Sequence, residues 1–327
     1  MRKYSPTYLL TLVLILLLPK AYAGEATTLP RLGVLVPESL RPESQVIRGL
    51  RQGLKELGYQ EKKSYALEIR DAKGDRSALA KEAAQLAGEK VQMILTTGTR
   101  ATRTAMEATR EIPIIFSHPA DPVALGLVKN PQRPGGNVTG VAAFAPQKTE
   151  KRMEILREVL PRVRRLRIFY DSNNPYSREN FLTAQKAAAK LGLEVEEYPI
   201  KSSEELKKSF SSLQNKEGDA LFQVADDLVE GEADFLFETA RQKRLPTMFN
   251  EETWAIRGAL AGYGPNYYEM GRQAARLAAS ILKGAKIQDL PVETASKFDL
   301  VINFRTARAI GLDLSRETLK KADKVIR

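Results

Sequence analysis

The sequence predicts an α/β protein made of two lobes, each with an open, doubly wound parallel sheet. Short apolar runs that are typical of buried strands alternate with helical segments along most of the 327 residues. The alternation stops at a stretch rich in glycine and proline, residues 130–137, and starts again after Pro146. Strands that alternate with helices over short connections indicate βαβ units, and the restart indicates two similar lobes.

The first half contains four predicted strands and three predicted helices. The helix over residues 42–57 places Val46, Leu50 and Leu54 at helical spacing and stops at Gly58, a residue that accepts the positive φ of a helix end. The strands are residues 32–36, 65–69, 91–95 and 112–116, and the other helices are residues 77–87 and 99–108.

The second half repeats this order of elements. Its helices are residues 148–160, 178–191, 203–214 and 230–243, and its strands are residues 166–170, 194–199 and 220–224. After Gly262 the sequence predicts a helix, a strand and two short helices, a tail too small to form its own domain. We therefore predict that the tail returns to the first lobe and ends in the second. The first lobe then comprises residues 30–144 and 266–293, and the second comprises residues 145–263 and 297–327.

The first 23 residues have the three parts of a secretory signal peptide. Arg2 and Lys3 precede an apolar run over residues 8–18, and the sequence Ala-Tyr-Ala at residues 21–23 provides a cleavage site. The run is too short to span a bilayer, although an uncleaved anchor is the alternative. Cysteine is absent, which excludes a lipid anchor on a thiol, disulfides and thiolate ligands. We expect cleavage after residue 23 and a free periplasmic protein.

The net charge of +11 does not indicate a nucleic-acid partner. Lysine and arginine stand beside glutamate and aspartate along the predicted helices, which is typical of solvated helix faces. The densest basic run, residues 162–167, leads directly into a predicted strand. We interpret this run as the exposed end of a helix–strand connection, with a docking patch for a partner as the alternative.

Polar residues follow most of the predicted strands. In open α/β sheets, ligands bind beyond the carboxyl ends of the strands. Short hydroxyl, amide, carboxylate and aromatic side chains collect there, as in a site for a small polar molecule. At any single position the ordinary alternative is a helix cap or a turn former. The strand-end segments are residues 37–39, 96–99, 117–121, 170–174, 225–227 and 263–264.

Several chemistries are disfavoured by the motifs that the chain lacks. No phosphate-binding loop and no dinucleotide fingerprint occurs, so we expect no nucleotide cofactor. His118, the single histidine, has no companions for a metal site and would more often orient a loop. Asp226 and Asp227 are two adjacent carboxylates, as a glycosidase would need, but adjacent residues on an extended segment point to opposite faces. At most one of the two is therefore expected to face the ligand.

Seven segments resemble the ABC-transporter substrate-binding family, which has tryptophan- and tyrosine-binding members. They occur in family order over nearly the whole mature chain, and they are residues 113–116 (PIIF), 121–128 (DPVALGLV), 133–140 (RPGGNVTG), 263–268 (YGPNYY), 271–275 (GRQAA), 282–285 (LKGA) and 290–293 (LPVE). The resemblance implies a type 1 periplasmic-binding-protein fold, with two α/β lobes, three hinge crossings and a ligand in the cleft between the lobes.

The resemblance also implies which residues bind the ligand. Carried over position by position, they are Thr97, Thr99, Ser117, Asp121, Tyr170, Ser172, Asn173, Asp227 and Tyr263. One segment departs from the family pattern: residues 117–120 (SHPA) stand where many relatives have a small, apolar stretch. The departure leaves the identity of the ligand open.

The resulting hypothesis is a periplasmic solute receptor of an ABC importer. It would capture a small polar organic ligand by lobe closure, without a cofactor, a metal or an enzymatic reaction. The protein itself is expected to be a monomer and to deliver the ligand to a permease in the inner membrane. One alternative is a ligand-sensing module for a signalling receptor, and the other is a secreted hydrolase.

The strand-end residues also suggest the class of ligand. Thr97 and Thr99, at the start of a helix, suit a carboxylate, and Asp121 or Asp227 suits an ammonium group. Tyr170 and Tyr263 are placed to stack on a planar or apolar group, and the alternative is that both only brace the hinge. Together these features favour an amino acid with an apolar or aromatic side chain.

Overall fold

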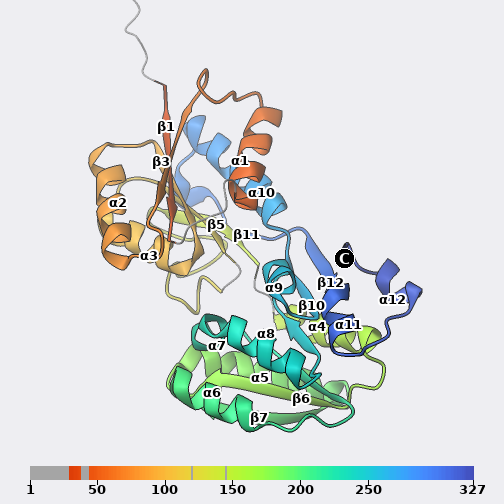
Figure 1. Cartoon of the computed structure of the whole chain (residues 1–327). Coiled ribbons are helices and arrows are strands. Elements are labelled where there is room, and N and C mark those ends of the chain that lie inside the picture. The colour runs from red at the N-terminus through yellow and green to blue at the C-terminus, as the bar shows by residue number, and fades with distance from the viewer. Residues whose placement is uncertain (1–28, 38–43, 119–120, 144–145) are drawn as a thin grey trace, which may run out of the picture.

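The computed structural model describes residues 29–37, 44–118, 121–143 and 146–327, and it confirms the predicted fold class (Figure 1). The signal peptide predicted for residues 1–23 lies outside the described residues. Within the described ranges, no helix combines the length and the apolar character needed to cross a membrane.

The first lobe is built on a six-stranded sheet in which every described pairing is parallel. In spatial order the strands are β11 (Glu293–Thr294), β5 (Val138–Ala142), β4 (Ile114–His118), β3 (Met93–Thr97), β1 (Arg31–Val36) and β2 (Ala66–Asp71). The helices of this lobe are α1 (Gln45–Glu56), α2 (Arg76–Gly88), α3 (Gly98–Ala108) and α10 (Tyr267–Leu282), with a 3-10 turn, η1 (Ile287–Asp289). Two apolar clusters lie on the two faces of the sheet, one including Val34 and Leu50 and the other including Leu35 and Leu79. Burial on both faces is what a doubly wound sheet requires.

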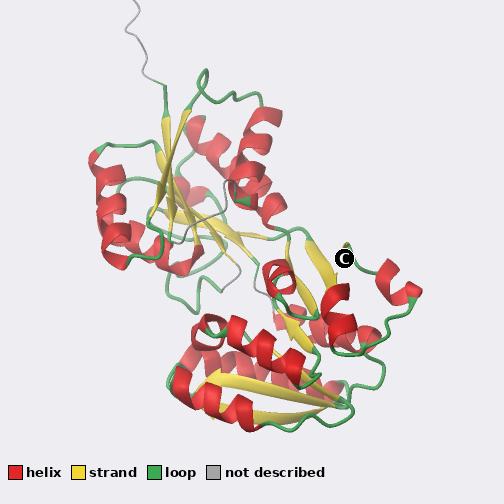
Figure 2. Cartoon of the chain, viewed as in Figure 1, coloured by secondary structure: helices red, strands yellow, loops and turns green. Residues whose placement is uncertain are grey.

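The second lobe is built on a seven-stranded sheet with one antiparallel pair, β10 with β12. In spatial order the strands are β13 (Lys324–Ile326), β12 (Phe298–Asn303), β10 (Ala261–Pro265), β9 (Thr247–Phe249), β8 (Asp219–Phe222), β6 (Arg165–Asp171) and β7 (Glu194–Ile200). Helices cover both faces of this sheet as well (Figure 2). They are α4 (Pro146–Val159), α5 (Pro175–Lys190), α6 (Ser203–Ser212), α7 (Asp227–Gly231), α8 (Ala233–Gln242), α9 (Glu252–Arg257), α11 (Phe304–Ala309) and α12 (Arg316–Lys320).

Three segments of chain join the two sheets: between β5 and α4, between β10 and α10, and between β11 and β12. The second of these segments is a single residue, Asn266, between β10 and α10. Asn266 also caps α10, because its side chain accepts a hydrogen bond from the Glu269 N–H at 2.9 Å. Residues that lie at the start of α10 are therefore fixed to both sheets.

The sequence patterns missed five strands, which are β5, β9, β10, β11 and β13, and the reason is visible for two of them. β10 contains Gly262 and Gly264, and a Cβ on either would stand 2.2 Å or less from a backbone oxygen of residues 250–251. Only glycine allows that approach, yet glycine lowers the strand signal in a sequence. β9 has three residues, too few for a recognisable alternation. The sequence patterns predict no strand over the residues of β5, β11 and β13. The helix predicted over residues 230–243 is two helices, α7 and α8, that meet at Glu232.

Candidate functional site

The candidate site lies where the carboxyl ends of the strands of the two lobes meet. Figure 1 shows α3 of the first lobe and α7 of the second at the facing ends of the lobes. Tyr176 of α5 lies close enough to Asp121, which follows β4, for that residue to affect the pKa of the tyrosine. We call the polar residues at this junction the interlobe site. Its position follows the general rule for open α/β sheets.

The first-lobe side of the interlobe site is the start of α3. Thr97 is the N-cap residue and makes no side-chain hydrogen bond to the helix, and Gly98 turns the chain with a φ of +83°. Thr97 pairs in register with Ser117 of β4, which is 1% exposed and whose hydroxyl has no hydrogen-bond partner among the described residues. Thr99 lies in the first turn and is half-buried. An uncapped helix start next to an unpartnered hydroxyl offers donors to an anionic group.

Asp121 has a structural task at the edge of this region. Its carboxylate accepts hydrogen bonds from the N–H groups of Val123 at 2.8 Å and Ala124 at 3.2 Å, which closes the turn after β4. The side chain of His118 lies outside the described part of the chain.

The loop after β6 is held by bonds within the second lobe. The Ser172 hydroxyl donates to the carbonyl of Ile200 at 3.2 Å, and Asn173 is exposed while its N–H donates to the Asp171 carboxylate at 2.8 Å. Asn174 caps α5 by accepting from the Tyr176 N–H at 3.0 Å. The serine hydroxyl is thus turned to the backbone of its own lobe, whereas the Asn173 side chain is exposed.

The two predicted tyrosines pack against protein rather than standing free. Tyr170 is 7% exposed, its ring stacks on Phe181 at 4.4 Å between ring centroids, and its hydroxyl lies 3.3 Å from a carboxylate oxygen of Glu197. The Tyr263 ring lies 5.9 Å from that of Phe298, in the β10–β12 pair next to the hinge. This packing favours the alternative in which both rings brace the second lobe and the hinge.

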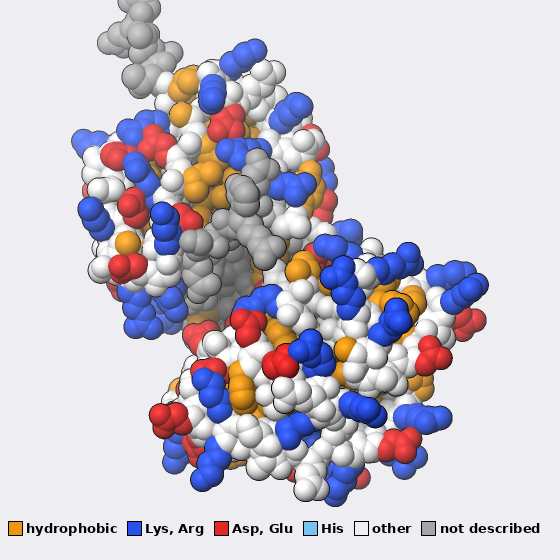
Figure 3. Space-filling model, in the orientation of Figure 1, with side chains coloured by type: hydrophobic (Ala, Val, Ile, Leu, Met, Phe, Trp, Pro, Cys, Tyr) orange, Lys and Arg blue, Asp and Glu red, His pale blue; other side chains and the backbone are white. Residues whose placement is uncertain are grey.

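Asp226 and Asp227 have different surroundings. Asp226 is buried, with one oxygen accepting from the Val229 N–H at 2.9 Å and the other from the Asp171 N–H at 2.6 Å. It therefore caps α7 and ties that helix to the loop after β6. Asp227 is exposed in the first turn of α7. Figure 3 shows acidic side chains on the second lobe over α7 and α8, on the side next to the first lobe.

The centre of the second-lobe side is Glu230 of α7. One of its carboxylate oxygens, Oε1, accepts from the amide Nε2 of Gln223 at 2.9 Å and from the amide Nδ2 of Asn250 at 3.4 Å. The amide oxygens of both partners are buried and have no hydrogen-bond partner within the described residues. Burial, together with the charges of Glu251 and Asp227, raises the pKa of Glu230 to about 8.

Glu251 and Tyr267 extend this group toward the first lobe. Burial raises the pKa of Glu251, although hydrogen bonds from Tyr267 and Thr253 oppose the shift. Burial and the neighbouring Glu251 carboxylate raise the pKa of the Tyr267 hydroxyl well above its usual value. Because Tyr267 begins α10, the acidic group of the second lobe is in contact with a first-lobe helix.

Arg152 of α4 is the cation beside this group. It is 5% exposed, it donates to the Gln223 carbonyl, and its guanidinium lies 4.2 Å from the centre of the Phe222 ring. Burial lowers its pKa to about 9, and the Glu230 charge acts in the opposite direction. The guanidinium is therefore charged at neutral pH.

The strand-end rule did not select most of these side chains. Gln223 follows β8 directly, and the predicted strand ran two residues too far to include it in the strand-end segment. Asn250 and Glu251 follow β9, a strand that the sequence did not predict. Glu230, Tyr267 and Arg152 stand on helices, and no sequence signal places them at the junction.

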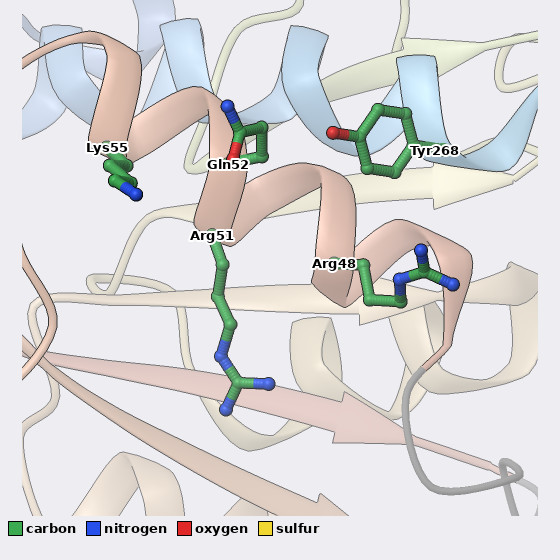
Figure 4. Close-up of a pocket in the computed structure, with 5 residues that line it drawn as sticks. All are labelled: Arg48, Arg51, Gln52, Lys55 and Tyr268. Atoms are coloured by element: carbon green, nitrogen blue, oxygen red, sulfur yellow. The ribbon is translucent and has the colours of Figure 1, made fainter.

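A separate groove of about 290 Å³ lies on the outside of the first lobe and is lined by residues from α1 and α10 (Figure 4): Arg48, Arg51, Gln52, Lys55 and Tyr268. Figure 4 shows Gln52 and Tyr268 side by side, whereas Arg51 extends away from them. Arg51 forms an ion pair with Glu61 at 2.9 Å. The groove is on the exposed face of α1 and takes no part in the junction, so it is not our candidate site.

No set of three or more histidine, cysteine, aspartate or glutamate residues in the described ranges has the arrangement of a metal site.

Comparison with protein families gives one match that covers almost the whole chain. The family model described as "ABC transporter substrate binding protein" matches residues 32–326. Among curated proteins, the chain is 28% identical over 274 residues to a tyrosine-binding protein of Clostridioides difficile, an alignment that covers 84% of this chain and 79% of that protein.

Solved structures show the same similarity. A conserved domain protein of Vibrio cholerae has 28% identity and a TM-score of 0.77, covering 91% of this chain and all of that one. A Streptococcus pneumoniae ABC domain in complex with L-Trp has 26% identity and a TM-score of 0.77, with the same two coverages. These similarities agree with the two-lobe architecture of a type 1 periplasmic binding protein.

Proposed function

The chain belongs to the ABC transporter substrate-binding protein family, and on that premise we propose that it captures an amino acid at the interlobe site and presents it to an importer. Its relatives are substrate-binding proteins and not enzymes, so the chain is expected to bind its ligand without converting it. The partner in this proposal is a membrane permease driven by separate ATPases. The proposed place of action is the periplasm, which rests on the export signal predicted for residues 1–23.

One observation carries the choice of ligand: the two sides of the interlobe site have opposite chemical character. The first lobe offers donors, which are the uncapped start of α3 and the unpartnered Ser117 hydroxyl. The second lobe offers acceptors, which surround Glu230. An amino acid carries a carboxylate and an ammonium group, and it would match both sides at once. The relatives named for tyrosine and for L-Trp support the same class.

This arrangement links binding to the closure of the lobes. We take residues 30–144 with 266–293 as one closing body and residues 145–263 with 297–327 as the other. A ligand that contacts both bodies binds the closed state more tightly than the open one, and it shifts the equilibrium by that difference in affinity. The closed state is then the form that the permease recognises.

Addition of L-tyrosine or L-tryptophan is expected to raise the melting temperature of the protein. A ligand at a hundredfold excess over its Kd stabilises the folded state by about 2.7 kcal/mol, because it binds only that state. The measurement is a thermal shift assay on protein that has been unfolded and refolded to remove copurified ligand. If a sugar or a nucleoside raises the melting temperature and no amino acid does, the amino-acid proposal is wrong although the receptor role stands.

Replacing Ser117 with alanine is expected to weaken L-tyrosine binding about tenfold or more. Loss of a hydrogen bond to a charged group costs about 1.5–3 kcal/mol, and about 1.4 kcal/mol is a factor of ten in Kd. Tyramine, which lacks the carboxylate, should bind this variant as it binds the wild type. Isothermal titration calorimetry measures both ligands. Ser212→Ala is the control, because that hydroxyl donates to the Ser209 carbonyl on an outer helix. Equal loss for tyramine would place the carboxylate elsewhere.

A further inference from the structure

We propose that Glu230 determines the class of ligand by binding its positively charged nitrogen, with the amides of Gln223 and Asn250 completing the subsite. This inference rests on the proposed receptor function and goes beyond it, because it assigns one residue to one chemical group of the ligand. It predicts that an organic cation is required and that a carboxylate on the ligand is not.

The hydrogen bonds around Glu230 leave acceptors and no donors once its carboxyl group is ionised. Both amide N–H groups that reach the carboxylate bind the same oxygen, Oε1. No donor among the described residues reaches the other oxygen, Oε2. The amide oxygens of Gln223 and Asn250 are buried and unpartnered, and each is carried by an amide that is already bonded to Glu230. Gln223 is 1% exposed, so its amide oxygen has no access to bulk water.

These three acceptors match the hydrogen-bonding groups of an ammonium ion. A primary ammonium has three N–H donors and no acceptor. A hydroxyl offers a single donor, and a ligand carboxylate offers none while it is ionised. The two buried amide oxygens cost about 1–3 kcal/mol each while they remain unpaired, so a ligand group that pairs with both of them and with Oε2 gains the most.

The charges around Glu230 also favour a cation. Asp226 and Asp227 lie on or next to α7, Glu251 precedes α9, and Arg152 extends from α4, while the phenols of Tyr176 on α5 and Tyr267 on α10 are uncharged. Arg152 is the single cation among these groups, and its side chain is fixed on the Gln223 carbonyl and the Phe222 ring. Once Glu230 is ionised, these carboxyl groups and the one guanidinium carry an excess of negative charge. An incoming cation would balance part of it.

The protonation of Glu230 gives this inference a signature that a merely structural residue lacks. Because burial raises the pKa of Glu230 to about 8, the carboxyl is mostly neutral at pH 7 before a cation arrives. A cation favours the ionised form, so binding releases a proton. As the pH is raised toward 8, the affinity should therefore increase about tenfold for each pH unit. Above pH 8 it should level off.

The test uses two amino acids with their matched analogues: L-tyrosine, tyramine and 3-(4-hydroxyphenyl)propionate, and L-tryptophan, tryptamine and indole-3-propionate. Isothermal titration calorimetry on refolded protein gives Kd for each compound between pH 6 and pH 8.5. We expect the amino acids and amines to bind at least about tenfold more tightly than the two deaminated acids. Titrations in two buffers with different ionisation enthalpies should show proton release.

Glu230→Gln should weaken binding of the amino acids and amines about tenfold or more and remove the rise of affinity with pH. Glutamine has the shape of the neutral carboxyl, so this variant should fold. The matched control is Glu232→Gln, a substitution two residues further along the chain that removes the same charge. The Glu232 carboxylate pairs with Lys207 at 2.8 Å. It should bind as the wild type does.

Three results would overturn this inference and leave the receptor role intact. They are equal binding of the deaminated acids, unchanged affinity in Glu230→Gln, and an affinity that falls as the pH rises to 8, which would mean that a neutral Glu230 donates to the ligand. Binding by none of the six compounds would contradict the amino-acid receptor itself, and this inference with it.

Discussion

Replacing Asp219 with alanine is expected to lower the free energy of unfolding by about 3 kcal/mol. Asp219 begins β8 and is buried, and one of its oxygens lies 2.7 Å from the guanidinium of Arg167, which is also buried. Its carboxylate also accepts from Arg165 at 2.8 Å and from the Lys216 N–H at 2.9 Å. Removing one partner of such a buried pair typically costs about 3–5 kcal/mol because the other charge stays buried. We expect the lower end, since Arg167 keeps an ion pair with Glu196 at 3.1 Å.

Urea unfolding followed by circular dichroism measures this loss. Glu217→Ala is the matched control, because its ion pair with Arg162 joins side chains that are 81% and 87% exposed. Such a pair contributes about 0–1 kcal/mol, so the control should be close to wild type. A loss in Asp219→Ala no larger than that of the control would show that the buried network does not stabilise the second lobe.

The same pair makes the stability difference depend on pH. Burial alone would raise the pKa of Asp219, but hydrogen bonds from Arg167, the Lys216 N–H and Arg165 outweigh it and lower the pKa. A carboxyl group whose pKa is lowered by folding stabilises the folded state at any pH above its pKa in the unfolded chain, which is about 3.9 for aspartate. This stabilisation is lost as the pH falls through the pKa of the group in the folded protein. The difference between wild type and Asp219→Ala should therefore be constant at neutral pH and shrink below about pH 4.

Replacing Gly271 or Gly49 with alanine is expected to cost about 3 kcal/mol in the free energy of unfolding. These glycines lie where α1 and α10 cross. A Cβ on Gly271 would stand 2.1 Å from the carbonyl oxygen of Val46, and one on Gly49 would stand 1.9 Å from that of Tyr268. Both obstacles are backbone atoms, so the helices themselves must move apart. Overpacking in a well-packed core costs about 1–3 kcal/mol, and we expect the upper end for this reason.

These substitutions should also weaken ligand binding, because α10 begins with Tyr267 of the interlobe site. Gly88→Ala is the control within a helix: a Cβ there meets nothing within 4 Å, and the change should stabilise the protein by about 0.4–1 kcal/mol. Thermal unfolding and calorimetry with L-tyrosine measure both effects. Wild-type stability in Gly49→Ala would mean that the close approach of the two backbones is not required to hold α10 in place.

The basic run at residues 162–167 shows how far a charge pattern alone can be interpreted. It was expected to be an exposed end of a connection, and Arg162 fits that description. Arg165 and Arg167 instead belong to β6 and bind Asp219, which is more than 50 residues away in sequence. A run of like charges does not reveal which members have partners, because the partners come from another strand.

The sequence by itself determined the two-lobe α/β architecture. Apolar runs such as residues 32–36 and 91–95 became central strands because buried parallel strands need apolar side chains on both faces. It also placed the start of α3 at residues 97–99, since a glycine after a strand marks a turn into a helix. Periodicity and turn residues are local signals, and they survive in any tertiary context.

Only the tertiary structure decided which side chains form the interlobe site. Packing on Phe181 holds the Tyr170 ring, and backbone N–H groups occupy both oxygens of Asp226. Glu230, Gln223 and Asn250 come from three segments that meet because β8 and β9 are neighbours and α7 ends one turn after its cap. The direction of a side chain depends on which partners it finds across the sheet. That information lies in the contacts between distant segments and not in the spacing of residues along the chain.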